Sequence, residues 1–239
     1  MTGNIDRVQI IARALGEIKE QVVFVGGSIV ELYADNPELS DIRPTIDVDC
    51  VTDLQICTYS DYSKLEQELR KLGFHDDTTE NAPICRKIYR GIKVDFMPVN
   101  PDILGFSNIW YKDGIANKTS VVLPGGIAIF IFPVEFFLAT KFEAMRNRGG
   151  ADIRGSHDWE DIVYVFENCG NILQNLQKCC NEKFIDYLQK EIRILLNNSN
   201  IREFIYSALP FNTEEESIDE ILCLMNKISL IKNVQIHSL

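Results

Sequence analysis

The strongest constraint on the fold is a change in residue pattern at Pro133. Before it, short runs of β-branched and aromatic residues alternate with stretches whose apolar residues follow helical spacing. After it, the patterned stretches repeat with the period of a helix, and proline is itself favoured in the first turn of a helix. We therefore expect an α/β (α+β) core over residues 1–132, with a mixed sheet flanked by helices. A C-terminal helical bundle is expected over residues 133–239.

These patterns also predict the individual elements. Strands are expected at 22–25, 45–51, 84–90, 92–98, 120–124 and 127–132. The tight junction at Arg90-Gly91 predicts that the third and fourth strands form a hairpin. Helices are expected at 5–19, 29–35, 63–74, 134–148, 158–168, 183–198, 201–209 and 214–230. Asn4 is the predicted N-cap of the first of these helices.

The charge of the chain argues against one class of function. The formal net charge is −11, from 35 acidic and 24 basic residues. A protein that coats nucleic acid without sequence preference needs an excess of Lys and Arg to neutralise phosphates, so that class is disfavoured. Local basic patches remain compatible with the sequence, at RKIYRGIK (86–93) and KFEAMRNR (141–148).

Cysteine usage and hydropathy indicate the compartment. The seven cysteines form no CxxC pair and their number is odd, which argues against a disulfide scaffold. They also form no cluster with the three histidines, so a zinc site is not expected, and each cysteine is predicted to be a small buried apolar residue. The N-terminus carries no signal-peptide pattern, and Pro133 and Glu135 interrupt the longest apolar stretch. We expect a cytoplasmic protein without a membrane segment.

Three aspartates in otherwise apolar strands point to a metal site. Side chains alternate between the faces of a strand, so Asp47 and Asp49 point the same way. Asp95 lies in the strand after Arg90-Gly91 and offers a third carboxylate. Clustered carboxylates repel one another unless a cation such as Mg²⁺, or alternatively Mn²⁺, lies between them. A pair of metal ions held in this way supports phosphoryl chemistry. A merely solvated strand edge is the other interpretation of the Asp47/Asp49 pair.

A Gly-Gly-Ser sequence directly follows the first predicted strand. Gly26 and Gly27 would let backbone N–H groups approach a ligand closely, and the helix expected after them would add its positive N-terminal end. The Ser28 hydroxyl adds a donor. These features predict a phosphate-binding turn, although a glycine pair alone is most often just a turn.

In combination, these motifs resemble the nucleotidyltransferase (DNA polymerase β-like) superfamily. The segment IRPTIDVDC is similar to the Arg-x-Thr-x-Asp-x-Asp motif of the AbiEii/MenT-type toxin nucleotidyltransferases. In that branch the sheet is followed by a helix with a lysine, a nearby arginine and a segment like Lys-Asp-x-x-Asp-Leu. Here Lys141, Arg146 or Arg148, and the segment 158–161 match that order, over about residues 20–168. His157 stands where the branch usually has lysine.

The resemblance implies a role for each matched residue. It implies Asp47 and Asp49 as metal ligands and catalytic residues. It implies that Asp95 completes the metal site and takes the proton from an acceptor hydroxyl. The nucleotide-binding residues that it implies are Gly26, Gly27, Ser28, Thr45, Lys141, Asp158 and Asp161.

The implied activity is Mg²⁺-dependent transfer of a nucleoside monophosphate from an NTP such as ATP to an acceptor hydroxyl. The branch suggests an RNA end, with tRNA as its precedent, and a toxin that has a cognate antitoxin or acts in phage defence. Two alternatives stay open. One is a nucleotidyltransferase that modifies a small molecule or a protein side chain, which the acidic charge favours. The other is a non-catalytic relative that binds a nucleotide or a partner protein.

Overall fold

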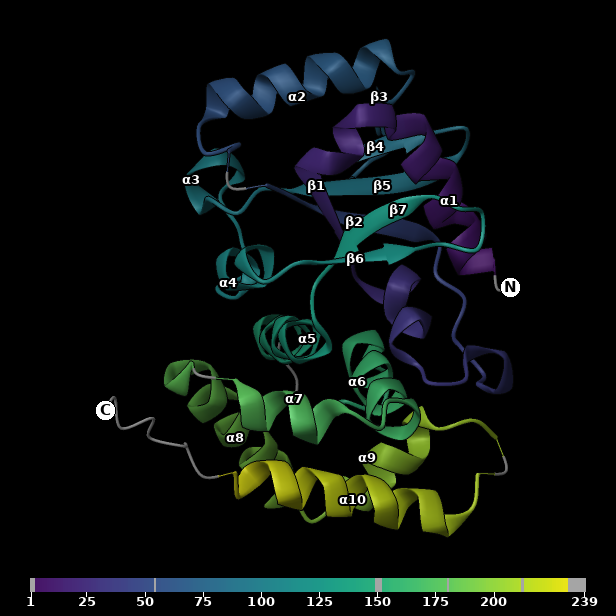
Figure 1. Ribbon diagram of the computed structural model, residues 1–239, viewed down its shortest axis with the longest axis vertical. Helices are drawn as coiled ribbons and strands as arrows, with labels where there is room; N and C mark the ends of the chain where they lie inside the picture. Colours follow the sequence, from purple (N-terminus) through teal and green to yellow (C-terminus); the bar gives the residue numbers. More distant parts are fainter. Residues whose placement is uncertain (1–2, 54, 149–151, 180, 212, 232–239) are drawn as a thin grey trace. The chain divides into compact units, whose positions relative to one another are not determined.

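The computed structural model describes residues 3–53, 55–148, 152–179, 181–211 and 213–231 (Figure 1). The chain divides into two compact units. The first runs up to Leu32 and from Ile42 to Thr140, and the second contains Tyr33–Asp41 and the chain from Lys141 onward. The sequence patterns predict a domain boundary after residue 132. The two compact units divide after Thr140, inside a helix, and the second unit also includes the segment Tyr33–Asp41 from the N-terminal half.

A seven-stranded mixed sheet forms the centre of the first unit (Figure 1). Its strands are β1 (Val22–Val25), β2 (Asp47–Thr52), β3 (His75–Asp76), β4 (Arg86–Tyr89), β5 (Ile92–Met97), β6 (Thr119–Val122) and β7 (Ala128–Ile131). Their order across the sheet is β3-β4-β5-β2-β1-β7-β6. The β2–β5 and β1–β7 pairs are parallel, and the other pairs are antiparallel. The predicted fold class, a mixed sheet flanked by helices and followed by helices, is confirmed.

The predicted hairpin is also confirmed. Strands β4 and β5 pair in an antiparallel register in which Tyr89 faces Ile92 across the turn. Arg90 and Gly91 both have positive φ, at 49° and 81°. A two-residue turn with two positive φ values matches the right-handed twist of the strands that it joins, which is why glycine is favoured there.

The other elements of the first unit are helical. They are α1 (Gly3–Leu15), α2 (Tyr59–Lys71), α3 (Pro101–Leu104), α4 (Tyr111–Ala116), the N-terminal part of α5 (Val134–Arg148) and the 3-10 helices η1 (Gly16–Gln21) and η2 (Gly27–Tyr33). Helix α2 packs on the sheet, where the buried Tyr62 hydroxyl donates to the Phe96 carbonyl at 2.7 Å. The sequence predicts Asn4 as an N-cap, and this prediction is wrong. Asn4 is instead a buried residue inside α1, and its side-chain amide donates to the Arg43 carbonyl at 3.0 Å.

The second unit is helical. It contains η3 (Pro37–Leu39), the C-terminal part of α5 (Val134–Arg148), and α6 (His157–Asn168), α7 (Ile172–Lys178), α8 (Glu182–Leu196), α9 (Ile201–Ala208) and α10 (Glu215–Ser229). Trp159 is fully buried, and its indole N–H donates to the Phe204 carbonyl at 2.8 Å. The segment 33–41 joins this unit because Asp35 donates its N–H to the Asn168 carbonyl, and Ser40 bonds the Tyr164 hydroxyl at 2.6 Å.

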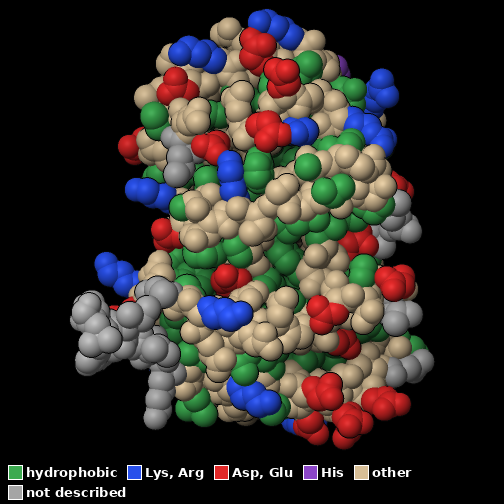
Figure 2. Space-filling view, in the orientation of Figure 1, with side chains coloured by type: hydrophobic (Ala, Val, Ile, Leu, Met, Phe, Trp, Pro, Cys, Tyr) green, Lys and Arg blue, Asp and Glu red, His purple; other side chains and the backbone are tan. Residues whose placement is uncertain are grey.

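Two surface observations refine the sequence-based picture. Acidic side chains gather over the N-terminal part of α10 (Figure 2), where 214–216, Asp219 and Glu220 are all exposed. Five of the 35 acidic residues therefore lie at the start of that helix or directly before it. The cysteines are not uniformly buried as predicted, because Cys57 and Cys223 are exposed, and Cys180 lies outside the described residues. Of the helices in the described part of the chain, none is both long and apolar enough to cross a bilayer.

Candidate active site

Strand register brings the three predicted carboxylates together in the first unit. Asp49 on β2 lies directly opposite Asp95 on β5, and Asp47 is two residues away on the same strand. Directly paired residues share a face of the sheet, and so do residues two apart on one strand. Asp47, Asp49 and Asp95 therefore point to the same face, as the sequence predicts. Asp95 is 8% exposed, which makes it the most buried of the three.

Gly26 lies against this cluster. It follows β1, which pairs with β2 so that Val25 faces Asp49. Its φ is +76°, a conformation that residues with a Cβ rarely adopt. A Cβ built on Gly26 would be 2.0 Å from the Asp49 Oδ2 atom, well inside van der Waals contact. The first glycine of the pair is thus required both by its backbone conformation and by the carboxylate packed on its Cα.

Ser28 has an unusual environment. Gly27 and Ser28 begin η2, and the Ser28 side chain is buried, with 1% exposure. Its hydroxyl has no hydrogen-bond partner in the described part of the chain. A buried hydroxyl without a partner costs free energy, so such groups are rare and often belong to a ligand site. The hydroxyl therefore fits the donor role that the sequence predicts for a bound phosphate.

Arg86 on β4 is the cation nearest to these carboxylates in the described contacts. It lies directly opposite Asp95 in the hairpin register. Its Nε donates to Asp95 Oδ1 at 2.7 Å and its Nη2 donates to Asp95 Oδ2 at 2.7 Å, and the same Nη2 also donates to Asp47 Oδ2 at 3.1 Å. The hydrogen bonds to Asp95, with smaller contributions from the Asp47 and Asp49 charges, raise the pKa of Arg86 above its ordinary value. One guanidinium thus bridges two of the three carboxylates.

Two further cations of the basic stretch 86–93, Lys87 and Arg90, are also engaged within the protein. Lys87 points to the opposite face of the sheet, where it is 2% exposed and forms ion pairs with Glu66 and Asp76. Arg90 lies over the Tyr89 ring, 5.4 Å from its centroid. Arg86 and Lys87 therefore neutralise internal carboxylates, and they do not contribute two free positive charges to a nucleic-acid surface.

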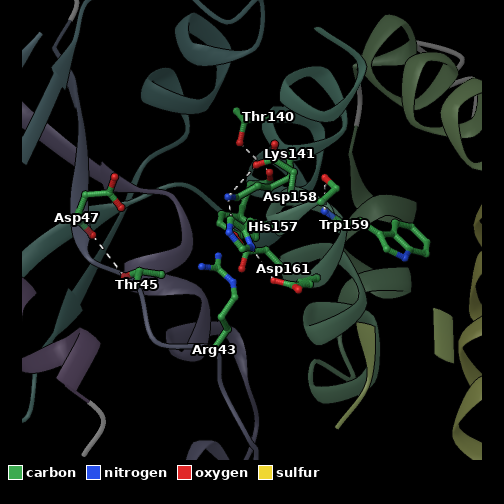
Figure 3. Close-up of polar contacts among 12 residues, drawn as sticks. Arg43, Thr45, Asp47, Thr140, Lys141, His157, Asp158, Trp159 and Asp161 are labelled. Atoms are coloured by element: carbon green, nitrogen blue, oxygen red, sulfur yellow. Dashed lines mark hydrogen bonds and ion pairs between the residues drawn. The ribbon is translucent and has the colours of Figure 1, made fainter. Parts of the chain in front are cut away.

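Thr45 positions the start of β2 (Figure 3). Its N–H donates to Asn4 Oδ1 at 2.9 Å, and its carbonyl accepts from Arg7 at 2.7 Å. Its hydroxyl donates to the Asp47 carbonyl at 3.4 Å. These bonds anchor the chain just before Asp47 and fix where the first carboxylate emerges. The predicted contact of Thr45 with a nucleotide stays a prediction.

In the second unit, Lys141 forms a buried ion-pair cluster with the two aspartates of α6 (Figure 3). Its Nζ is 3.2 Å from Asp158 Oδ1 and 2.6 Å from Asp161 Oδ2, and Arg148 pairs with Asp158 at 2.5 Å. The Lys141 side chain is 11% exposed, and both aspartates are almost fully buried. In these contacts the two aspartates already offset the charges of Lys141 and Arg148. The predicted nucleotide contacts of Lys141, Asp158 and Asp161 stay predictions, and the observed role of the two aspartates is to hold Lys141.

The predicted site can be tested for its fit to a divalent cation. Among the described residues, no three His, Cys, Asp or Glu side chains are arranged so that they would hold a metal ion as they stand. The chemistry of the donors still fits, because carboxylate oxygens are the ligands that Mg²⁺ prefers. Asp47 and Asp95 also converge on one point, where a nitrogen of Arg86 contacts both. The residues fit a cation, and a guanidinium now occupies the place between two of them.

Arg86 is the residue of this candidate site that sequence reasoning missed. A signal was available, because a two-residue turn at Arg90-Gly91 pairs Arg86 with Asp95 by counting outward along both strands. The contact of Arg86 with Asp47 had no such signal, since it depends on the parallel pairing of β2 with β5.

Comparisons with known proteins found a likeness among solved structures. No protein-family model matches this chain. No curated protein matches it either. Among solved structures, a crystal structure of an antigenic nucleotidyltransferase-like protein from Paracoccidioides brasiliensis is similar, with 15% identity and a TM-score of 0.46. The match covers 85% of this chain and 92% of that chain.

Proposed function

We propose that this protein is a nucleotidyltransferase, which transfers a nucleoside monophosphate from an NTP to an acceptor hydroxyl and releases pyrophosphate. The observation that carries the proposal is the register of β1, β2 and β5. It aligns Asp47, Asp49 and Asp95 on one face, directly beside Gly26. Three carboxylates held together in a sheet are unfavourable in a purely structural site, since like charges repel and burial penalises each of them.

Each residue has a distinct role in this proposal. Asp47, Asp49 and Asp95 would hold Mg²⁺ or Mn²⁺, which would neutralise charge developing on the triphosphate. Asp95 would accept the proton of the acceptor hydroxyl, a role that requires one of its oxygens to be released by Arg86. The backbone of Gly26 and Gly27 and the unpartnered hydroxyl of Ser28 would bind phosphate oxygens.

The acceptor has two candidates. The motif resemblance suggests an RNA end such as that of tRNA, which would make the protein a toxin with an antitoxin partner or a phage-defence enzyme. A small molecule or a protein side chain is the second candidate. It is favoured by the internal ion pairs of Arg86 and Lys87, which remove two charges from the basic stretch 86–93, and by the net charge of −11.

Radiolabelled nucleotides test this proposal directly. The purified protein is incubated with Mg²⁺ and each α-³²P-labelled NTP, first with total RNA and then with a panel of hydroxyl-bearing small molecules and proteins. We expect label to be transferred to one class of acceptor and to be lost with Asp49→Asn, which retains the shape of the side chain. If label is never transferred, or is transferred equally by Asp49→Asn, the proposal is wrong. Nucleotide binding without transfer would instead support a non-catalytic relative.

A further inference from the structure

The contact between Arg86 and two of the three clustered carboxylates is not explained by the proposed chemistry. A guanidinium that chelates a carboxylate through two parallel N–H···O bonds is among the strongest pairings available to a side chain. Here it uses both oxygens of Asp95 and one oxygen of Asp47. The side chains of Arg86 and Asp95 are only 15% and 11% exposed, so solvent screens the pair weakly.

This arrangement competes with a bound metal ion. A divalent cation between Asp47 and Asp95 would need oxygen lone pairs that Arg86 now occupies, and it would repel the guanidinium at close range. Arg86 is attached to β4, which is fixed to β5 by the hairpin register, so its backbone cannot withdraw. Its long side chain can rotate away and leave the strand in place.

We propose that Arg86 is a displaceable internal counter-ion. It holds Asp47 and Asp95 when no divalent cation is bound, and it gives up at least one of them when the cation and its nucleotide arrive. The proposal rests on the proposed function only in taking Asp47, Asp49 and Asp95 as the cation ligands. It accounts for the fact that Asp47, Asp49 and Asp95 do not form a group of ligand side chains already arranged for a metal.

Once released, Arg86 is available to bind an anion. Its planar set of donors fits phosphate oxygens as well as it fits a carboxylate. Removing Arg86 should therefore have two opposite effects: it should tighten the binding of the metal ion alone and weaken the binding of the NTP. A residue that only stabilised the fold would weaken both or change neither.

The test is a titration with Mn²⁺ alone, in which electron paramagnetic resonance measures the free ion. Wild type, Arg86→Gln and Arg86→Lys are compared with Arg70→Gln. This control removes the same charge from an exposed ion pair between α2 and Asp76. We expect Arg86→Gln to bind Mn²⁺ tighter by a factor on the order of ten, because one competing positive charge is gone. Arg70→Gln should match wild type, and adding Asp49→Asn to Arg86→Gln should abolish the gain.

Arg86→Lys keeps the test decisive if Arg86→Gln does not fold. Lysine keeps the charge but cannot chelate a carboxylate in two parallel bonds, so we expect an intermediate Mn²⁺ affinity and a folded protein by circular dichroism. If neither variant binds Mn²⁺ more tightly than wild type, the inference is overturned. The KM for NTP should rise in Arg86→Gln, and an unchanged KM would also count against it.

The outcome separates this inference from the proposed function. Tighter Mn²⁺ binding by Arg86→Gln, with no nucleotide transfer by wild type to any acceptor, would support the counter-ion and refute the enzyme. Nucleotide transfer by wild type, with unchanged Mn²⁺ affinity in both Arg86 variants, would support the enzyme and refute the counter-ion.

Discussion

Replacement of Gly26 by alanine tests whether the Asp49 carboxylate really lies on the glycine backbone. Two separate penalties are expected. The first is conformational, because φ at Gly26 is +76°, where a residue with a Cβ is disfavoured by about 1–2 kcal/mol. The second is steric, because the new Cβ would lie 2.0 Å from Asp49 Oδ2 and 2.8 Å from Asp49 Cγ. Asp49 would then have to leave its rotamer, at a further cost of about 1 kcal/mol.

Gly126 provides a matched control for the conformational penalty. Its φ is also +76°, but a Cβ built on it meets no atom within 4 Å. Gly126→Ala should therefore lose only the conformational part, about 1–2 kcal/mol of unfolding free energy. Gly26→Ala should lose about 1 kcal/mol more. Urea denaturation followed by circular dichroism measures both variants, and an unchanged m-value would show that the same transition is compared.

Nucleotide transfer should separate the two variants more clearly. A displacement of a catalytic group on the order of 1 Å costs about 100-fold in rate, so Gly26→Ala should lose at least that much while Gly126→Ala keeps wild-type activity. In the double variant Gly26→Ala/Asp49→Ala the two closest atoms are gone, and of the three nearest atoms the Asp49 Cβ at 2.9 Å is left. Its loss of unfolding free energy should therefore be smaller than the sum of the losses in the two single variants. Equal behaviour of the two alanine variants in both assays would refute the reasoning.

Three further predictions use other residues. Ser28→Ala should leave the unfolding free energy unchanged or raise it, because it removes a buried hydroxyl without a partner. NTP binding, measured by calorimetry, should weaken by about 1 kcal/mol. A large loss of stability would mean that the hydroxyl is bonded. Lys141→Met should lower the unfolding free energy by about 3–5 kcal/mol, because it removes the Lys141 ammonium that pairs with the buried Asp158 and Asp161. A melting temperature equal to that of wild type would contradict this. Burial, with a smaller contribution from the charge of Asp95, raises the pKa of the Cys85 thiol to about 12, so this thiol stays protonated at pH 8. It should react with Ellman's reagent only after unfolding, and rapid reaction in the native protein would exclude that environment.

The sequence by itself determined most of the elements and one face of the site. Period-two spacing in TIDVDCV put Asp47 and Asp49 on the same side of a strand, and the turn residues Arg90-Gly91 defined a hairpin. Helical spacing after Pro133 predicted the long helices α5, α6, α8, α9 and α10. These inferences succeed because they depend on contacts between near neighbours along the chain, whose geometry is set by local periodicity and turn chemistry.

Tertiary structure alone decided how the charges are used. The sequence shows Arg86, Lys87 and Lys141 as basic residues beside motifs, and each proves to be paired with buried or half-buried carboxylates. It also shows Gly26 as part of a turn, whereas the steric need for glycine there comes from Asp49, 23 positions further along the chain. Charge pairing and close packing join residues from different elements, and a one-residue shift in strand register would exchange every such partner. Local sequence carries no record of that register for β1, β2 and β5, so only the assembled sheet shows which cation meets which carboxylate.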